Sequence, residues 1–176
     1  MKKTVIDGVN YYPHSNGGGL VAETATVSKT AYIGRDAIVH DNSEVSGNAE
    51  VFEYAQVFGS AKVFGHAMVW GNAKVTDAKI NASVWDNAEV FGNAEVSGNA
   101  KVWGKAKVFG NAQVFGNAQV FDHAQVFDHA EVFGDAQVFD HAEVSDYAEV
   151  SGKAKISGNT KVTKEINSRE KVTANT

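Results

Sequence analysis

The sequence predicts an all-β, single-domain parallel β-helix of about eight triangular coils. Three observations lead to this prediction. A valine or isoleucine recurs at every sixth residue from Val84 to Val162. An alanine or threonine stands two residues before each of them. A pair such as Gly-Asn or Asp-His separates one short apolar segment from the next, and such pairs form turns at little steric cost.

The order of residues within one hexad explains the predicted coil. Residues 108–113 read Val-Phe-Gly-Asn-Ala-Gln. Only one polar residue separates the alanine from the next valine, so strand alternation places both on one face. Three bends would close one coil and stack identical residues in parallel ladders. We expect valine to fill the interior, where each buried side chain contributes about 1.5 to 3 kcal/mol.

Three segments of the chain differ in pattern. Residues 1–20 combine Tyr11-Tyr12-Pro13-His14 with three consecutive glycines, and we expect either a cap over the first coil or a disordered arm. Residues 21–162 form the predicted β-helix. In residues 163–176 the pattern decays, and we expect a short charged helix or one imperfect further coil.

The repeat changes phase within residues 76–83. Ile80 follows Val75 by five residues, and Val84 follows Ile80 by four. Three residues are therefore missing across residues 76–83. We therefore expect two tightened corners or one irregular coil, and no long functional loop.

Composition excludes several classes of function. The formal charge of −5 and the scattered Lys and Arg residues disfavour nucleic-acid binding, which needs clustered cations. Apolar runs stay far below the roughly 20 residues that span a bilayer, and Met1-Lys2-Lys3 precedes no signal-peptide core. The chain has no cysteine, which permits a cytoplasmic setting. We expect a cytoplasmic protein that binds neither membranes nor nucleic acid.

Every Phe and Trp of the chain directly follows an inward-facing aliphatic residue. Alternation points these rings outward, and the coil repeat aligns them in columns. The rings could form ladders with one another, or an exposed patch that binds a partner or a second copy of the chain. The candidate interface residues are Trp103, Phe109, Phe115, Phe121, Phe127, Phe133 and Phe139.

The three predicted faces differ in charge. One face is acidic and carries Glu95, Gln113, Glu131 and Glu149. A second is basic and carries Lys101, Gln119, Gln137 and Lys155, with Lys105, His123 and His141 at its turn. The third alternates in sign. An acidic face packed against the basic face of another chain would suit a parallel trimer, so we expect a homo-oligomer and favour a trimer.

The pairs Asp122-His123 and Asp140-His141 should stack one coil apart. Two imidazoles and two carboxylates at this spacing could hold zinc or another divalent metal. Alternatively, Asp-His simply replaces Gly-Asn in the turn, as Asp128-His129 does on another face. His123 and His141 are also the candidates for a catalytic base. Because the coils are so alike, we expect no catalytic residue. We favour the turn substitution over a metal site, and we expect no metal and no cofactor.

Residues 32–39, Tyr-Ile-Gly-Arg-Asp-Ala-Ile-Val, resemble the signature of the hexapeptide-repeat superfamily. The resemblance covers about residues 21–162. It implies a left-handed coil, and from the enzymes of the superfamily it implies a trimer and acyl transfer with a histidine base. Most units differ, with Phe, Trp or Ser after the aliphatic residue and Gly or Asp one place later. This variant is similar to the Val-Tyr/Phe-Gly-Asn-Ala repeats of uncharacterised bacterial and phage proteins.

These observations support three hypotheses of function. The first is a non-catalytic structural or binding protein, a rigid self-associating rod that presents aromatic and charged faces. Catalysis needs one coil to differ from its neighbours, and these hardly do. A phage origin would place the rod in the host cytoplasm or the virion. The second is an acyltransferase that uses acetyl-CoA, which rests on the resemblance. The third is a protein that binds or sequesters small molecules between subunits.

Overall fold

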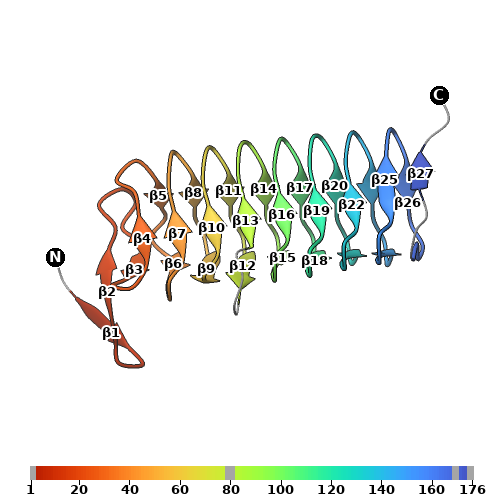
Figure 1. Cartoon of the computed structure of the whole chain (residues 1–176). Coiled ribbons are helices and arrows are strands. Elements are labelled where there is room, and N and C mark those ends of the chain that lie inside the picture. Colours follow the sequence, from red (N-terminus) through yellow and green to blue (C-terminus); the bar gives the residue numbers. More distant parts are fainter. Residues whose placement is uncertain (1–2, 78–81, 168–170, 174–176) are drawn as a thin grey trace.

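The computed structural model describes residues 3–77, 82–167 and 171–173. These residues form three long sheets that wind around one axis as a β-helix of about eight coils (Figure 1). The described part of the chain contains no helix, so the predicted all-β fold of triangular coils is confirmed. None of the described residues belongs to a helix long and apolar enough to cross a membrane.

Each side of the triangular coil contributes its strands to one sheet, and we call the three sheets A, B and C. Sheet A contains β1 (Thr4–Ile6), β2 (Val9–Pro13), β3 (Leu20–Ala22), β6 (Ile38–Val39), β9 (Gln56–Gly59), β12 (Lys74–Asp77), β15 (Glu95–Val96), β18 (Gln113–Val114), β21 (Glu131–Val132) and β24 (Glu149–Val150). Apart from β1 and β2, its strands pair in parallel with strands one coil away.

The other two sheets contain only parallel pairs. Sheet B contains β4 (Thr26–Val27), β7 (Glu44–Val45), β10 (Lys62–Val63), β13 (Ser83–Val84), β16 (Lys101–Val102), β19 (Gln119–Val120), β22 (Gln137–Val138), β25 (Lys155–Ser157) and β27 (Lys171–Thr173). Sheet C contains β5 (Tyr32–Ile33), β8 (Glu50–Val51), β11 (Met68–Val69), β14 (Glu89–Val90), β17 (Lys107–Val108), β20 (Gln125–Val126), β23 (Glu143–Val144) and β26 (Lys161–Val162).

The core is a column of aliphatic side chains along the axis. The interior valines from Val39 to Val150 and the corner alanines from Ala49 to Ala154 are fully buried. Ser43 occupies a corner position and is equally buried; its hydroxyl donates to the His40 carbonyl oxygen at 2.6 Å, and the Val57 carbonyl oxygen lies 3.2 Å away as a second acceptor. A polar side chain is therefore tolerated at this buried corner position because a nearby backbone carbonyl accepts its hydrogen bond.

The N-terminal segment covers the first coil. Strands β1 and β2 form an antiparallel hairpin that pairs with β3, so sheet A ends in a hairpin (Figure 1). Gly17, Gly18 and Gly19 then pass beside the first strand of sheet C, where the Gly19 amide donates to the Ile33 carbonyl at 2.9 Å. A Cβ atom on Gly17 or Gly19 would lie 2.2 Å from a backbone oxygen of residue 33 or 34. This close approach requires glycine.

The prediction that three residues are missing near residue 80 is wrong. Val63 in β10 pairs with Val84 in β13, which makes this coil 21 residues long, whereas Val108 pairs with Val126 one ordinary coil later. Val84 follows Val75 by nine residues instead of six, so one side of one coil contains three extra residues. The expectation that Ile80 is an interior position falls on residues 78–81, which lie outside the described residues.

After Val162 the chain continues as an imperfect coil. Ile166 pairs with Val150 as an isolated bridge, and its carbonyl accepts the Ser151 amide at 3.0 Å. Strand β27 then adds to β25 at the end of sheet B. Of the two alternatives for this segment, the described residues therefore form the further coil and not the helix.

Candidate functional site: aromatic columns and a histidine groove

Each outward ring is held at a strand end by the corner that follows it. The Phe109 amide donates to the Val126 carbonyl at 2.9 Å, and the Ala112 amide closes the turn on the Phe109 carbonyl at 3.4 Å. Between them Gly110 has a φ of 72°, and a Cβ there would lie 2.8 Å from the Asp128 amide nitrogen. The corner fixes the ring direction and keeps adjacent coils in close contact.

Two continuous columns of five rings run along the rod. Column B follows the strands of sheet B, and column C follows those of sheet C. Within both, centroid distances are 4.4 to 5.6 Å and interplanar angles are 1° to 4°. Column B consists of Phe64, Trp85, Trp103, Phe121 and Phe139. Column C consists of Phe52, Trp70, Phe91, Phe109 and Phe127.

Column A, along sheet A, is interrupted. It contains the stacked pair His40 and Phe58 and the stacked pair Phe115 and Phe133, each with centroids 4.9 Å apart. Thr76 and Ser97 occupy the ring position on the coils between the two pairs.

The seven candidate interface rings all belong to these columns, and each stacks on at least one neighbour. They are half-buried: the ring faces cover one another and the edges reach solvent. The ladder arrangement is thus present in the structure. Binding of a partner stays a prediction, and such a partner would meet ring edges.

Two corners of the triangle carry ladders of polar side chains. Between sheets A and B, Asn99 donates to Asn117 and Asn117 to Asp135, both at 2.9 Å. Between sheets C and A, Asn93 donates to Asn111 at 2.9 Å. Sequence reasoning treated these asparagines only as turn residues. Their recurrence once per coil was the signal that could have predicted the ladders.

The third corner, between sheets B and C, holds the histidine pair. His123 and His141 stack with centroids 4.8 Å apart and an interplanar angle of 18°, as the spacing predicts. The aspartates beside them have φ values of 60° and bind the backbone of the next coil. Asp122 accepts the Asp140 amide at 3.4 Å, and Asp140 accepts the Gly158 amide at 3.0 Å.

These contacts explain why Asp replaces Gly at a corner. Asp tolerates positive φ better than most residues, and its carboxylate accepts an amide of the following coil. Asp41 and Asp128 do the same at other corners. The four candidate metal ligands therefore divide into stacked imidazoles and backbone-bound carboxylates. Among the described residues, no group of three or more His, Cys, Asp or Glu side chains is arranged to hold a metal ion.

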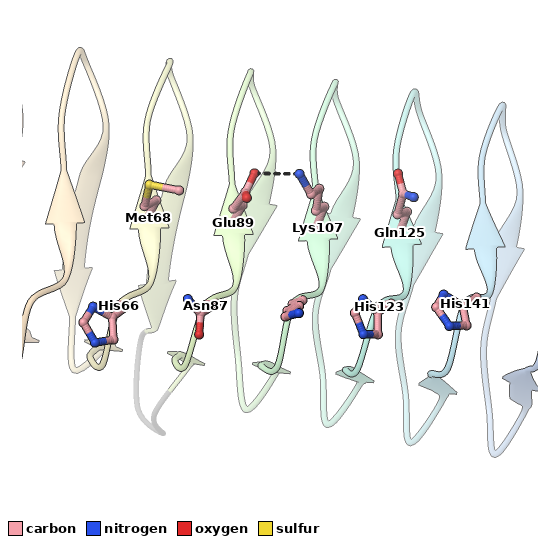
Figure 2. Close-up of a pocket in the computed structure, with 9 residues that line it drawn as sticks. His66, Met68, Asn87, Glu89, Lys107, His123, Gln125 and His141 are labelled. Atoms are coloured by element: carbon pink, nitrogen blue, oxygen red, sulfur yellow. Dashed lines mark ion pairs between the residues drawn. The ribbon is translucent and has the colours of Figure 1, made fainter.

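A groove of about 460 Å³ lies beside the histidine corner. Figure 2 shows its lining as two parallel rows along the rod, one from the corner and one from the strands of sheet C. The corner row contains His66, Asn87, Lys105, His123 and His141. The strand row contains Met68, Glu89, Lys107 and Gln125.

The charges in the groove are unbalanced. Among the described residues that line the groove, Glu89 is the only acidic one, and it forms an ion pair with Lys107 at 3.1 Å. Lys105 is exposed and has no ion pair among the described residues. Within the described lining, Lys105 is therefore the cation without an ion pair, whereas His123 and His141 each follow an aspartate whose carboxylate accepts a backbone amide.

No model of a protein family, no curated protein and no solved structure matches the chain. The resemblance to hexapeptide-repeat proteins thus rests on the repeat itself.

Proposed function

We propose that this protein is a non-catalytic scaffold, a rigid β-helical rod that acts by presenting its outer surface and that associates with further copies of itself. The observation that supports this most is the constancy of the coils after the irregular one. From Ser83 to Val162, each strand pairs with the strand 18 residues further along the chain, and the interior position is always valine or isoleucine. Such a surface offers the same chemistry repeatedly.

The charge distribution supports self-association. Sheet A places Glu131 directly beside Glu149, so their like charges repel unless a cation lies opposite. Sheet B carries the basic side chains Lys101 and Lys155. Packing sheet A of one copy against sheet B of another would place opposite charges side by side. The trimer and the left-handed coil implied by the resemblance are part of this proposal.

The groove favours a second candidate, an acyltransferase that takes acetyl-CoA and uses His123 or His141 as the base. A catalytic histidine usually needs a partner that fixes its tautomer and orientation. Here the adjacent aspartates accept backbone amides, and no described carboxylate forms an ion pair with either imidazole. We therefore prefer the scaffold.

Light scattering after size-exclusion chromatography tests the proposal. We expect an oligomer, and a monomer at micromolar concentration would contradict self-association. The triple variant Phe109→Ser/Phe115→Ser/Phe121→Ser should lower the oligomeric mass if the ring edges form the interface. A fall in melting temperature with unchanged mass would assign these rings to ladders alone.

The two candidates differ in their response to acetyl-CoA. A scaffold should show no change in melting temperature when acetyl-CoA or CoA is added. An upward shift that disappears in both His123→Asn and His141→Asn would support the acyltransferase. His129→Asn is the matched control, because His129 occupies the same hexad position at another corner.

A further inference from the structure

Among the described strands, the N-terminal hairpin leaves one edge of sheet A unpaired. Strand β1 is outermost in this sheet, and its neighbour there is β2 (Figure 1). At sheet C, by contrast, the chain closes the edge of the first strand: the Ile33 amide donates to the Asn16 carbonyl at 3.0 Å, and the Ile33 carbonyl accepts the Gly19 amide at 2.9 Å. An open edge like that of β1 can pair with a strand of another chain.

The side chains of β1 are exposed and largely apolar. Val5 is 56% exposed and Ile6 is 37% exposed. Among the described residues, these are the only exposed large aliphatic side chains, since the other exposed large hydrophobic residues are aromatic. Soluble proteins usually avoid aliphatic side chains on an unpaired edge strand, unless that edge binds something. Strand β1 is therefore a candidate interaction surface.

The hairpin turn determines which backbone groups of β1 are free. Asp7 and Gly8 have φ values of 49° and 81°, as a two-residue type I′ turn requires. Such a turn joins the Ile6 carbonyl to the Val9 amide, and hydrogen-bonded and non-hydrogen-bonded pairs alternate from there along the hairpin. Val5, one residue further, belongs to a non-hydrogen-bonded pair. Its N–H and C=O groups therefore point to the open edge.

The sequence of β1 is complementary to itself in one antiparallel register. If Val5 lies opposite Val5 of a second copy, the two residues exchange both backbone hydrogen bonds. The same register places Thr4 opposite Ile6. It also places Lys3 opposite Asp7, once on each side of the two-fold axis, and opposite charges across a strand pair are favourable. A register shifted by one residue would place Lys3 opposite Ile6 and lose both charge pairs.

We propose that β1 pairs antiparallel with β1 of a second copy, so that two rods join end to end at their N-terminal hairpins. Such an isologous contact uses the same surface on both copies and closes after two. The inference rests on the proposed function, because it names one contact through which the protein associates with itself. It does not use the ring columns, which lie along the sides of the rod. Since β1 is only 3 residues long, the contact is reversible and depends on concentration.

Sedimentation equilibrium of the full chain over a range of concentrations tests the contact. We expect the mass of the wild-type protein to double as its concentration rises. Val5→Pro removes the N–H donor at the open edge and keeps the bonds from β1 to β2, and proline is tolerated at such edge positions. This variant should stay at half the wild-type mass and raise the dissociation constant by about tenfold or more. Circular dichroism and the melting temperature check its fold.

A second variant leaves the backbone of β1 unchanged. Lys3→Glu places like charges opposite each other and should raise the dissociation constant roughly threefold at low salt. Adding Asp7→Asn removes that repulsion and should restore part of the association; asparagine tolerates positive φ, so the turn is kept. The matched control is Lys164→Glu, which makes the same charge change on an exposed side chain near the other end of the chain and should leave the mass unchanged.

An unchanged mass in both Val5→Pro and Lys3→Glu would overturn the inference. Comparison with the Phe109→Ser/Phe115→Ser/Phe121→Ser variant separates it from the proposed interface of ring edges. If that triple variant lowers the mass and Val5→Pro does not, self-association stands and pairing through β1 is wrong. If only Val5→Pro lowers the mass, pairing through β1 stands and association through the ring edges is wrong.

Discussion

Column B and column A start from the same corner geometry and differ in continuity. In column B each of Trp85, Trp103 and Phe121 is covered on both faces by other rings. In column A, Phe115 and Phe133 cover each other on one side only, and Ser97 and Ser151 occupy the next positions outward. The strands inside are paired in the same way in both cases.

This difference separates two roles of the hexad. Pairing of the strands does not depend on the ring, because coils with Ser at the ring position have the same register as coils with Phe. The rings add contacts between coils, and columns B and C continue across the coil with three extra residues, where Trp70 stacks on Phe91 at 4.4 Å. The valine ladder therefore forms the coil, and the ring columns reinforce it.

The largest expected effect is the loss of a ring from the middle of column B. Trp103→Ser removes two stacking contacts and should destabilise the fold by about 2 to 4 kcal/mol, since each stacked pair contributes about 0.5 to 1.5 kcal/mol in addition to buried area. Phe133→Ser removes one contact and should cost about half as much. Thermal unfolding of both variants measures the difference. Equal losses would show that continuity of the column contributes nothing.

Adding a ring to column A should have the opposite effect and stabilise the fold. Ser97→Phe places a ring on the free face of Phe115, since Ser97 lies on the adjacent coil. We expect a gain of about 1 kcal/mol, which corresponds to a rise of about 2 to 4 °C in melting temperature for a chain of this length. Ser97→Ala is the control and should leave the melting temperature unchanged. A lower melting temperature for Ser97→Phe would contradict the stacking account.

A smaller effect on stability is expected from the charged side chains that neighbour one another on adjacent coils. Glu131→Gln removes the like-charge contact with Glu149 and should stabilise the fold by roughly 0.2 to 0.5 kcal/mol at low salt. On sheet C, Glu143→Gln removes the ion pair with Lys161 at 2.9 Å and should not stabilise it. Melting curves at low and high salt distinguish the two, because added salt should reduce the gain from Glu131→Gln.

The smallest effect concerns the hairpin cap at alkaline pH. Burial raises the pKa of Tyr11 above its ordinary value of 10.0, and Asp41 and Asp7 raise it further. The folded protein thus holds this proton more tightly than the unfolded chain does. The resulting stability is complete below the ordinary pKa and is lost as pH rises through the folded pKa.

Tyr11→Phe should reduce this alkaline loss slightly, measured as the melting temperature between neutral pH and about pH 11. Tyr12→Phe is the control, because Tyr12 lies on the opposite, exposed face of the same strand. If both variants respond identically to pH, the buried phenol does not contribute.

Much of the fold could be predicted because its rules are local. Alternation placed Val108 and Ala112 inside and Phe109 outside, and the regular repeat predicted the stacking of Phe109 on Phe127. The groove could not be predicted in the same way. It depends on bringing the corner row and the sheet C row together, and on Lys107 being neutralised while Lys105 is not.

The sequence by itself determined the strands, the valine core, the ring columns and the alternating charges. Each hexad repeats the same short strand and turn, with the same positions inside and outside. Only the tertiary structure decided that the coil before Val84 gains residues instead of losing them, since Ile80 has the same local pattern as an interior residue. It also decided that Asp122 and Asp140 bind the next coil's backbone. These contacts join residues one coil apart, and no local pattern specifies which partner a carboxylate finds.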